Sequence, residues 1–360
     1  MRRAGEPRRH GGSPSRGARV LRRLHGAARA CPRDGDLRGA VGGPRWRRLL
    51  RELLHGADRW RGRRRDLLQR GRARPARLLF RRRRRSRGGA LYADVVHALG
   101  PPGPAGARRL CPVGGRMNAA TLDLRGEARA RAFDVSGYPA ALFPSAIRTW
   151  HARMVNEHGS SAVFEALAGQ LAEASFPPEL VEACRGFADE ERRHGILCGA
   201  VVEALGGTAT ASVPERPEFP LHRDAPPRAA ALRNVIHICC MSETVAVALI
   251  GAERLEMPPG PLLDLLTRIY ADEVGHARFG WRLLEQVAPE LSSAERQAVE
   301  RYLPVAFRHL VEHEHAHLPA HDAPPDGEQL GLCSGLKARV LLDETIEEVI
   351  RPGLRRFFDC

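Results

Sequence analysis

The chain has 360 residues, enough for two domains of ordinary size, and its formal net charge of +15 is very unevenly distributed. Residues 1–116 contain 33 Arg, no Lys and seven acidic residues, a balance of +26, whereas the other 244 residues carry 24 basic and 35 acidic side chains, a balance of −11. The basic charge therefore does not define the whole chain as a nucleic-acid binder. The lack of an uninterrupted apolar run of about 18 residues argues against a membrane span.

Residues 1–116 lack the features of a folded domain. Arg, Gly, Pro and Ala dominate, residues 81–85 are all Arg, and apolar clusters such as 78–80 are too short to close a core. We expect this third either to be disordered, as a basic arm for nucleic acid or anionic surfaces, or not to be translated at all. An Arg-rich stretch without Lys is what a GC-rich gene yields upstream of its start codon, so a native start at Met117 is favoured. A targeting segment is less favoured, because no apolar stretch follows the charges.

Prolines and glycines divide the acidic remainder into six predicted helices. They span about residues 145–175, 179–206, 228–256, 261–288, 293–318 and 336–358, the last interrupted at Pro352-Gly353. Only a few residues join the first helix to the second and the third to the fourth, so each pair is predicted to be an antiparallel hairpin. About 20 residues rich in Pro and Thr link the hairpins, enough to cross the length of one helix.

Two antiparallel hairpins joined by one long crossover are typical of a ferritin-like four-helix bundle. The predicted fold class is therefore all-α. The bundle is expected over residues 145–290, and residues 291–360 add two C-terminal helices that pack on it.

Each of the first four helices carries one apolar stripe that Glu interrupts near the middle. The interrupting residues are Glu157 in the first helix, Glu191 and His194 in the second, Glu243 in the third, and Glu273 and His276 in the fourth. Glu243 and Glu273 lie 14 and 13 residues from their hairpin turn, which places both about 20 Å from it. The heights in the first hairpin match more loosely. All six side chains are predicted to meet in one interior layer.

Four carboxylates in one apolar layer require cations. A buried unpaired carboxylate is strongly destabilising, and no Lys or Arg lies on these stripes. Two divalent ions would balance the four carboxylates, and one neutral imidazole would complete the shell of each. This oxygen-rich donor set suits iron or manganese better than structural zinc. We therefore expect two iron ions, with a Mn/Fe pair as the alternative.

The pattern of Glu and His occurs twice. Glu157 precedes the segment EERRH at 190–194, and Glu243 precedes the segment DEVGH at 272–276. This doubled signature resembles that of ferritin-like di-iron carboxylate proteins, which include arylamine N-oxygenases, rubrerythrin-like proteins and bacterial multicomponent monooxygenases. The resemblance covers about residues 145–287 and implies that the six interior Glu and His side chains bind the metals.

The resemblance also implies a role for the acidic residue before the Glu of each second helix. In the family this residue often orients a ligand histidine from behind. The corresponding residues are Asp272 and Glu190, and Glu190 departs from the usual Asp by one methylene.

Other residues that can carry chemistry have plainer interpretations. A cluster near the end of the fifth predicted helix invites a second metal site; it comprises His309, Glu312, His313, Glu314, His315 and His317. A solvated helix end is the favoured interpretation, because cations are stabilised there and no stripe Glu pairs with the cluster. Ordinary packing is favoured over a redox role for Tyr270, as it is for Trp150 and Met154.

Glutamates off the stripes and the cysteines have no expected catalytic role. Glu165, Glu173 and Glu182 are predicted to be surface charges. The eight Cys residues show no metal-binding or redox spacing, so reduced, buried thiols in a cytoplasmic protein are expected.

A di-iron carboxylate centre is suited to reduction of O₂ or peroxide. We expect an oxidoreductase that activates O₂ to oxidise or oxygenate a small organic substrate, because two helices beyond the bundle can wall a substrate pocket. Such an enzyme needs an electron donor, either a protein or a small reductant. The alternatives are ferritin-like iron storage or detoxification, and peroxide reduction without an organic substrate. A homodimer is compatible with the sequence, and nucleic acid is not an expected partner.

Overall fold

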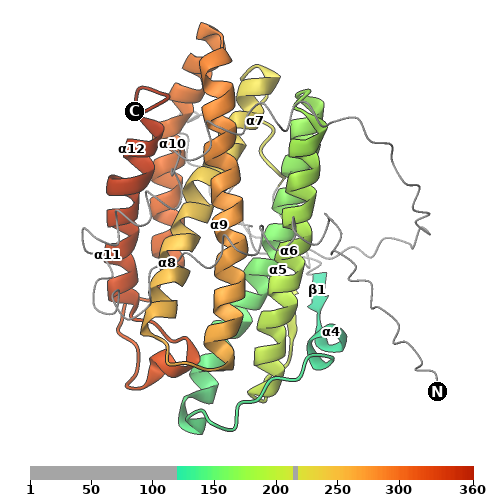
Figure 1. Cartoon of the computed structure of the whole chain (residues 1–360), viewed down its shortest axis with the longest axis vertical. Helices are drawn as coiled ribbons and strands as arrows, with labels where there is room; N and C mark the ends of the chain where they lie inside the picture. The colour runs from blue at the N-terminus through green and yellow to red at the C-terminus, as the bar shows by residue number, and fades with distance from the viewer. Residues whose placement is uncertain (1–119, 214–217) are drawn as a thin grey trace, which may run out of the picture. The chain divides into compact units, whose positions relative to one another are not determined.

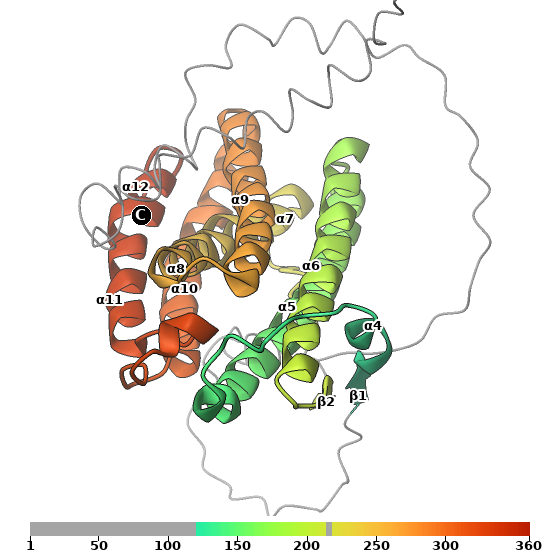
Figure 2. The ribbon, with the colours of Figure 1, turned by 60° about the horizontal axis from the view of Figure 1, so that its bottom comes forward.

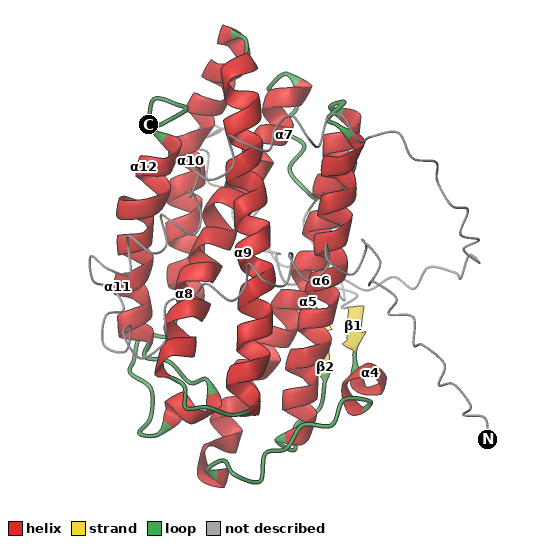
Figure 3. Cartoon of the chain, in the orientation of Figure 1, coloured by secondary structure: helices red, strands yellow, loops and turns green. Residues whose placement is uncertain are grey.

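The computed structural model describes residues 120–213 and 218–360, and these are mostly helical (Figure 3). The expectations for residues 1–116, including the start at Met117, lie outside the described residues.

The first predicted hairpin consists of α5 (Phe143–Glu173) and α6 (Pro178–Ala204), close to the predicted 145–175 and 179–206. Both helices have Pro in the first turn, where its missing N–H costs no helical hydrogen bond. Ser175 adopts a left-handed conformation, with φ of 60°, in the short turn between them. The two helices pack against each other along their length and lie side by side (Figures 1 and 2).

The third predicted helix is continuous but not α-helical throughout. It consists of α7 (Pro227–Val235), a π-helical segment η4 (Ile236–Ser242) and α8 (Glu243–Glu256). Residues 257–260 then turn the chain into α9 (Pro261–Val287), which packs against both α8 and η4. The π-helical segment was not predicted, and such segments are frequent at functional sites.

The C-terminal part adds further helices beside α7 and α8. They are α10 (Ser293–His317), α11 (Gly335–Thr345), the π-helical segment η7 (Ile346–Ile350) and α12 (Arg351–Leu354). Ser292 and Glu295 form a capping box that fixes the start of α10. α10 packs along α7, and α11 packs against α8. The interruption expected at Pro352-Gly353 is wrong, because both residues lie within α12, which continues directly from η7.

Short elements connect these helices. They are a five-residue helix α4 (Arg125–Arg129) and the 3₁₀ turns η3 (Ala140–Leu142), η5 (Ala288–Glu290) and η6 (Gly327–Leu330). α4 packs against α6. Two four-residue strands that were not predicted, β1 (Ala120–Asp123) and β2 (Thr210–Val213), pair in antiparallel register.

The crossover between the hairpins is fastened to the helices by amide side chains. Buried Asn234 of α7 donates to the carbonyl of Pro220 at 2.7 Å and to Oε1 of Gln170 at 2.8 Å. Gln170 of α5 in turn donates to the carbonyl of Leu221 at 3.3 Å. The crossover therefore binds to one helix of each hairpin.

The helix from Pro227 to Glu256 is long and apolar enough to cross a membrane by length and composition alone. However, 72% of its most apolar window is buried inside the structure, as in the core helix of a soluble protein. It also carries Glu243, which is buried with it.

Gly280 allows α9 to lie very close to η4. A Cβ at this position would be 2.5 Å from Cβ of Cys239 and 2.9 Å from Sγ of Cys240, both buried. No side chain fits there unless η4 and α9 move apart.

Gly280→Ala is expected to destabilise the protein by about 1–3 kcal/mol, because one methyl group overpacks this contact. Gly275→Ala is the matched control. Gly275 lies on the same helix, and a Cβ added there would meet nothing within 4 Å beyond its own turn of helix. That control should stabilise the protein by about 0.5–1 kcal/mol. Urea denaturation of both metal-free variants measures the difference, and equal midpoints would contradict the close approach.

Candidate metal centre

Six carboxylate and imidazole side chains meet in the interior between the two hairpins. They are Glu157 of α5, Glu191 and His194 of α6, Glu243 of α8, and Glu273 and His276 of α9. None is more than 8% exposed. The structure thus brings together all six residues that the interrupted stripes single out.

The six side chains form two overlapping groups, each able to hold a metal ion. One group is Glu157, Glu191, His194 and Glu273, and the other is Glu191, Glu243, Glu273 and His276. Within each group all donor atoms lie within 4.8 Å of one another. Glu191 and Glu273 belong to both groups, so these two carboxylates lie between the two positions.

Both histidines turn Nδ1 toward the carboxylates. Nδ1 of His276 lies 3.1 Å from Oε1 of Glu191 and 3.2 Å from Oε2 of Glu273. Nδ1 of His194 lies 3.3 Å from Oε1 of Glu273 and 3.4 Å from Oε2 of Glu157. The two contacts of His194 Nδ1 do not have hydrogen-bond geometry, so this nitrogen is a buried polar atom without a hydrogen bond. An ion among these atoms would satisfy it.

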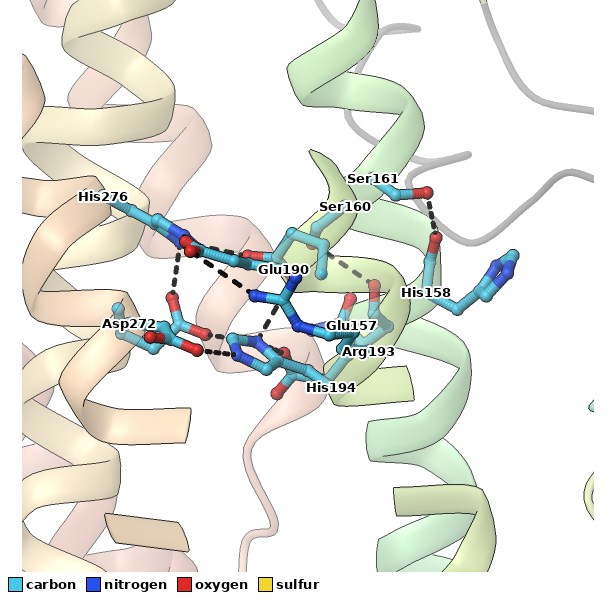
Figure 4. Close-up of polar contacts among 12 residues, drawn as sticks. Glu157, His158, Ser160, Ser161, Glu190, Arg193, His194, Asp272 and His276 are labelled. Atoms are coloured by element: carbon cyan, nitrogen blue, oxygen red, sulfur yellow. Dashed lines mark hydrogen bonds and ion pairs between the residues drawn. The ribbon is translucent and has the colours of Figure 1, made fainter. Parts of the chain in front are cut away.

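The other ring nitrogen of each histidine contacts a carboxylate of the opposite hairpin (Figure 4). Nε2 of His194 lies 3.1 Å from Oδ2 of Asp272, and Nε2 of His276 lies 2.9 Å from Oε2 of Glu190. When Nε2–H donates to these carboxylates, Nδ1 keeps its lone pair for an ion. Asp272 and Glu190 thus lie where ligand-orienting residues are needed, and Glu190 also pairs with Arg193 at 3.5 Å.

Without metal, the electrostatics of this layer favour bound protons. Burial raises the pKa of Glu191 to about 8, and repulsion by Glu273 adds to the shift. Burial, with Glu273 again, raises the pKa of Glu243 well above its usual range. Burial opposes the charged forms of His194 and His276, but the carboxylates around them outweigh it and raise both pKa values. Burial likewise opposes ionisation of Glu273, yet the two histidines lower its pKa.

The immediate surroundings of the centre are apolar and aromatic. The ring centroids of Phe187 and Phe164 lie 4.5 and 5.1 Å from that of His276. One turn before Glu157, Arg153 forms a bidentate ion pair with Glu253 at 2.6 and 2.9 Å. The charge of this arginine is therefore already matched and does not neutralise the carboxylate layer.

The residues given plainer interpretations are placed mostly as expected. Trp150 and Met154 are fully buried, and Tyr270 is 9% exposed beneath the guanidinium of Arg254. Three glutamates predicted to be surface charges are exposed; they are Glu165, Glu173 and Glu182. The cross-hairpin contacts of Asp272 and Glu190 had no signal in local spacing, because each partner lies on a helix of the other hairpin.

No protein-family model matches the chain, and neither a curated protein nor a solved structure is significantly similar to it. The residues and geometry of the site therefore carry the functional proposal by themselves.

Metal-free protein is expected to lose stability as the pH rises from about 6.5 to 8, where buried histidines with lowered pKa values, such as His237, are neutral in both the folded and the unfolded chain. Over this range the folded chain keeps a proton on Glu191 that the unfolded chain, with a pKa of 4.5, has released. Fewer protons bound in the unfolded state mean that stability falls with pH, by about 1.4 kcal/mol per proton and pH unit. The raised pKa values of His194 and His276 act in the same direction above pH 6.5.

The measurement is the melting temperature after chelation, across this pH range. Glu191→Gln should flatten the dependence, whereas Glu173→Gln on the exposed face of α5 should leave it unchanged. Bound metal should remove the fall, because it takes the place of the protons. A melting temperature of the metal-free protein that rises from pH 6.5 to 8 would contradict these electrostatics.

Proposed function

We propose that α5, α6, the α7–α8 helix and α9 form a ferritin-like four-helix bundle around a centre for two iron ions. The protein is then an oxidoreductase that activates O₂ to oxidise or oxygenate a small organic substrate. The observation that carries the proposal is the sharing of Glu191 and Glu273 by two donor groups. Two shared carboxylates between two sets of terminal ligands suit a two-metal site.

Each ion would have its own carboxylate and imidazole. Glu157 and His194 would hold one ion, Glu243 and His276 the other, and the two shared carboxylates would contact both. Four carboxylates balance two divalent ions, so the buried layer becomes neutral with neutral imidazoles. An oxygen-rich donor set with one imidazole per ion favours iron, with a Mn/Fe pair as the alternative.

Two Fe²⁺ ions held there would supply the two electrons that reduce O₂. The chain's own contribution is to hold and shield the ligands. Asp272 and Glu190 accept hydrogen bonds from Nε2 of the two histidines and fix their ring orientation. The rings of Phe164 and Phe187 pack against His276 and make that side of the centre apolar.

The proposed enzyme needs an electron donor, either a protein or a small reductant. We also propose that the enzyme itself is soluble and cytoplasmic. The six cysteines within the described residues are free, and Cys184, Cys198, Cys239 and Cys240 are buried. Reduced buried thiols are typical of the cytoplasm.

The shared carboxylates should control the occupancy of both ions. Glu273→Gln is expected to abolish binding of both ions, whereas Glu157→Gln should leave one ion per chain. Glu173→Gln, also on α5 but exposed, should leave two. Iron per chain after anaerobic Fe²⁺ loading and desalting gives the result. Retention of two irons by Glu273→Gln would contradict a shared-carboxylate centre.

Fe²⁺-loaded protein should consume O₂ in stoichiometric amounts, and repeatedly when a reductant is supplied. An oxygen electrode measures consumption, with His276→Ala as the variant expected to lose it. Iron storage makes a different prediction, because iron would accumulate far beyond two per chain in a large hollow particle visible by light scattering. That outcome would contradict the oxidoreductase function and support iron storage.

A further inference from the structure

Four histidines outside the carboxylate centre form a continuous ladder of rings, here called the imidazole ladder. It consists of His237 of η4 and of His309, His313 and His317 of α10. Successive ring centroids lie 5.1, 6.0 and 4.2 Å apart. The three α10 histidines recur every four residues and so share one helix face, which meets η4 at His237.

The inner half of the imidazole ladder is buried. His237 is 9% exposed and His309 is 8% exposed. The solvated helix end expected from the sequence is therefore wrong for His309, although Glu312 and His317 are exposed. Nδ1 of His237 and Nδ1 of His309 are both buried without a hydrogen-bond partner among the described residues. Buried polar atoms normally have a partner, so these two nitrogens, on rings whose centroids lie 5.1 Å apart, favour a bound group.

Both buried imidazoles are in the form that binds metals. Burial lowers the pKa of His237 to about 3, with repulsion by His309, His313 and His222 adding to the shift. Burial also lowers the pKa of His309. At neutral pH each ring is therefore neutral and has one unprotonated nitrogen, as metal ligation requires.

The ring spacing fits a common ion. Two imidazoles on one tetrahedral zinc, with Zn–N bonds of about 2.0–2.1 Å, have centroids roughly 5 Å apart. The His237–His309 separation of 5.1 Å has this value. Within the described residues, groups of three or more His, Cys, Asp or Glu donor atoms already within 4.8 Å of one another occur only in the carboxylate centre. The ladder rings must therefore turn about χ2, a soft torsion, to share an ion.

We propose that His237, His309 and His313 form a second metal site, which binds one divalent transition-metal ion of the zinc, nickel or copper type. Water would fill the fourth position, because His317 lies about 12 Å along the helix from His309, too far for both to bind one tetrahedral ion. Neutral nitrogen donors select these metals, whereas the carboxylate centre suits iron or manganese. The ion would also join α10 to the helix that carries Glu243.

The test uses the full chain with the carboxylate centre disabled by Glu191→Gln and Glu273→Gln. Zn²⁺ is titrated into the metal-free protein against a chromophoric chelator. One Zn²⁺ per chain is expected to bind, and Co²⁺ in its place should give the intense visible absorption of a four-coordinate site. The proposal does not depend on the oxidoreductase function, because this background has lost the carboxylate centre.

Loss of a ladder ligand should weaken Zn²⁺ binding by more than about 10-fold. Mutation of a residue that only hydrogen-bonds to a metal ligand already lowers metal affinity by about 10-fold or more. The first variant, His309→Phe, keeps an aromatic ring in the buried position. The second variant, His313→Ala, changes only a half-buried residue, so it tests the site even if His309→Phe does not fold. His315→Ala is the matched control, because this α10 histidine contacts Arg339 and Asp343 of α11 instead. Unchanged affinity in His313→Ala, or an equal loss in His315→Ala, would overturn the proposal.

Discussion

Four carboxylates buried at one level between apolar helices need matching positive charge, and much of the described structure depends on that need. Burial, with repulsion by Glu273, raises the pKa of Glu191 and Glu243, so the metal-free chain holds protons where an ion would otherwise be. Arg153, one turn from Glu157, is already paired with Glu253, and Arg193 pairs with Glu190. Metal ions would therefore both supply chemistry and stabilise the packed state, since binding free energy adds to folding free energy.

The contacts around this layer also join the two hairpins. His194 of the first hairpin is held by Asp272 of the second, and His276 of the second is held by Glu190 of the first. Each hairpin thus orients a ligand of the other, so neither half of the site is complete alone. The close approach of α9 to η4 at Gly280 holds the second hairpin together just before Glu243 enters the site.

Sequence alone predicted the long helices and the six interior residues, because apolar stripes repeat over many turns and an interrupting Glu stands out against them. The first helix was expected at 145–175 and spans Phe143–Glu173. Features that depend on distant partners had no such signal. The strand β1 exists through pairing with β2 about 90 residues later, η4 changes the helical phase only locally, and the burial of His309 depends on how α10 meets η4.

The central claim is tested most directly by locating the bound metal in crystals of the iron-loaded protein. Crystals grown with Fe²⁺ under anaerobic conditions should show two anomalous-scattering peaks about 3.5–4 Å apart at the iron edge. Both peaks should lie within bonding distance of Glu191 and Glu273. A single peak, or iron bound away from these carboxylates, would contradict a centre in which two ions balance the buried charge.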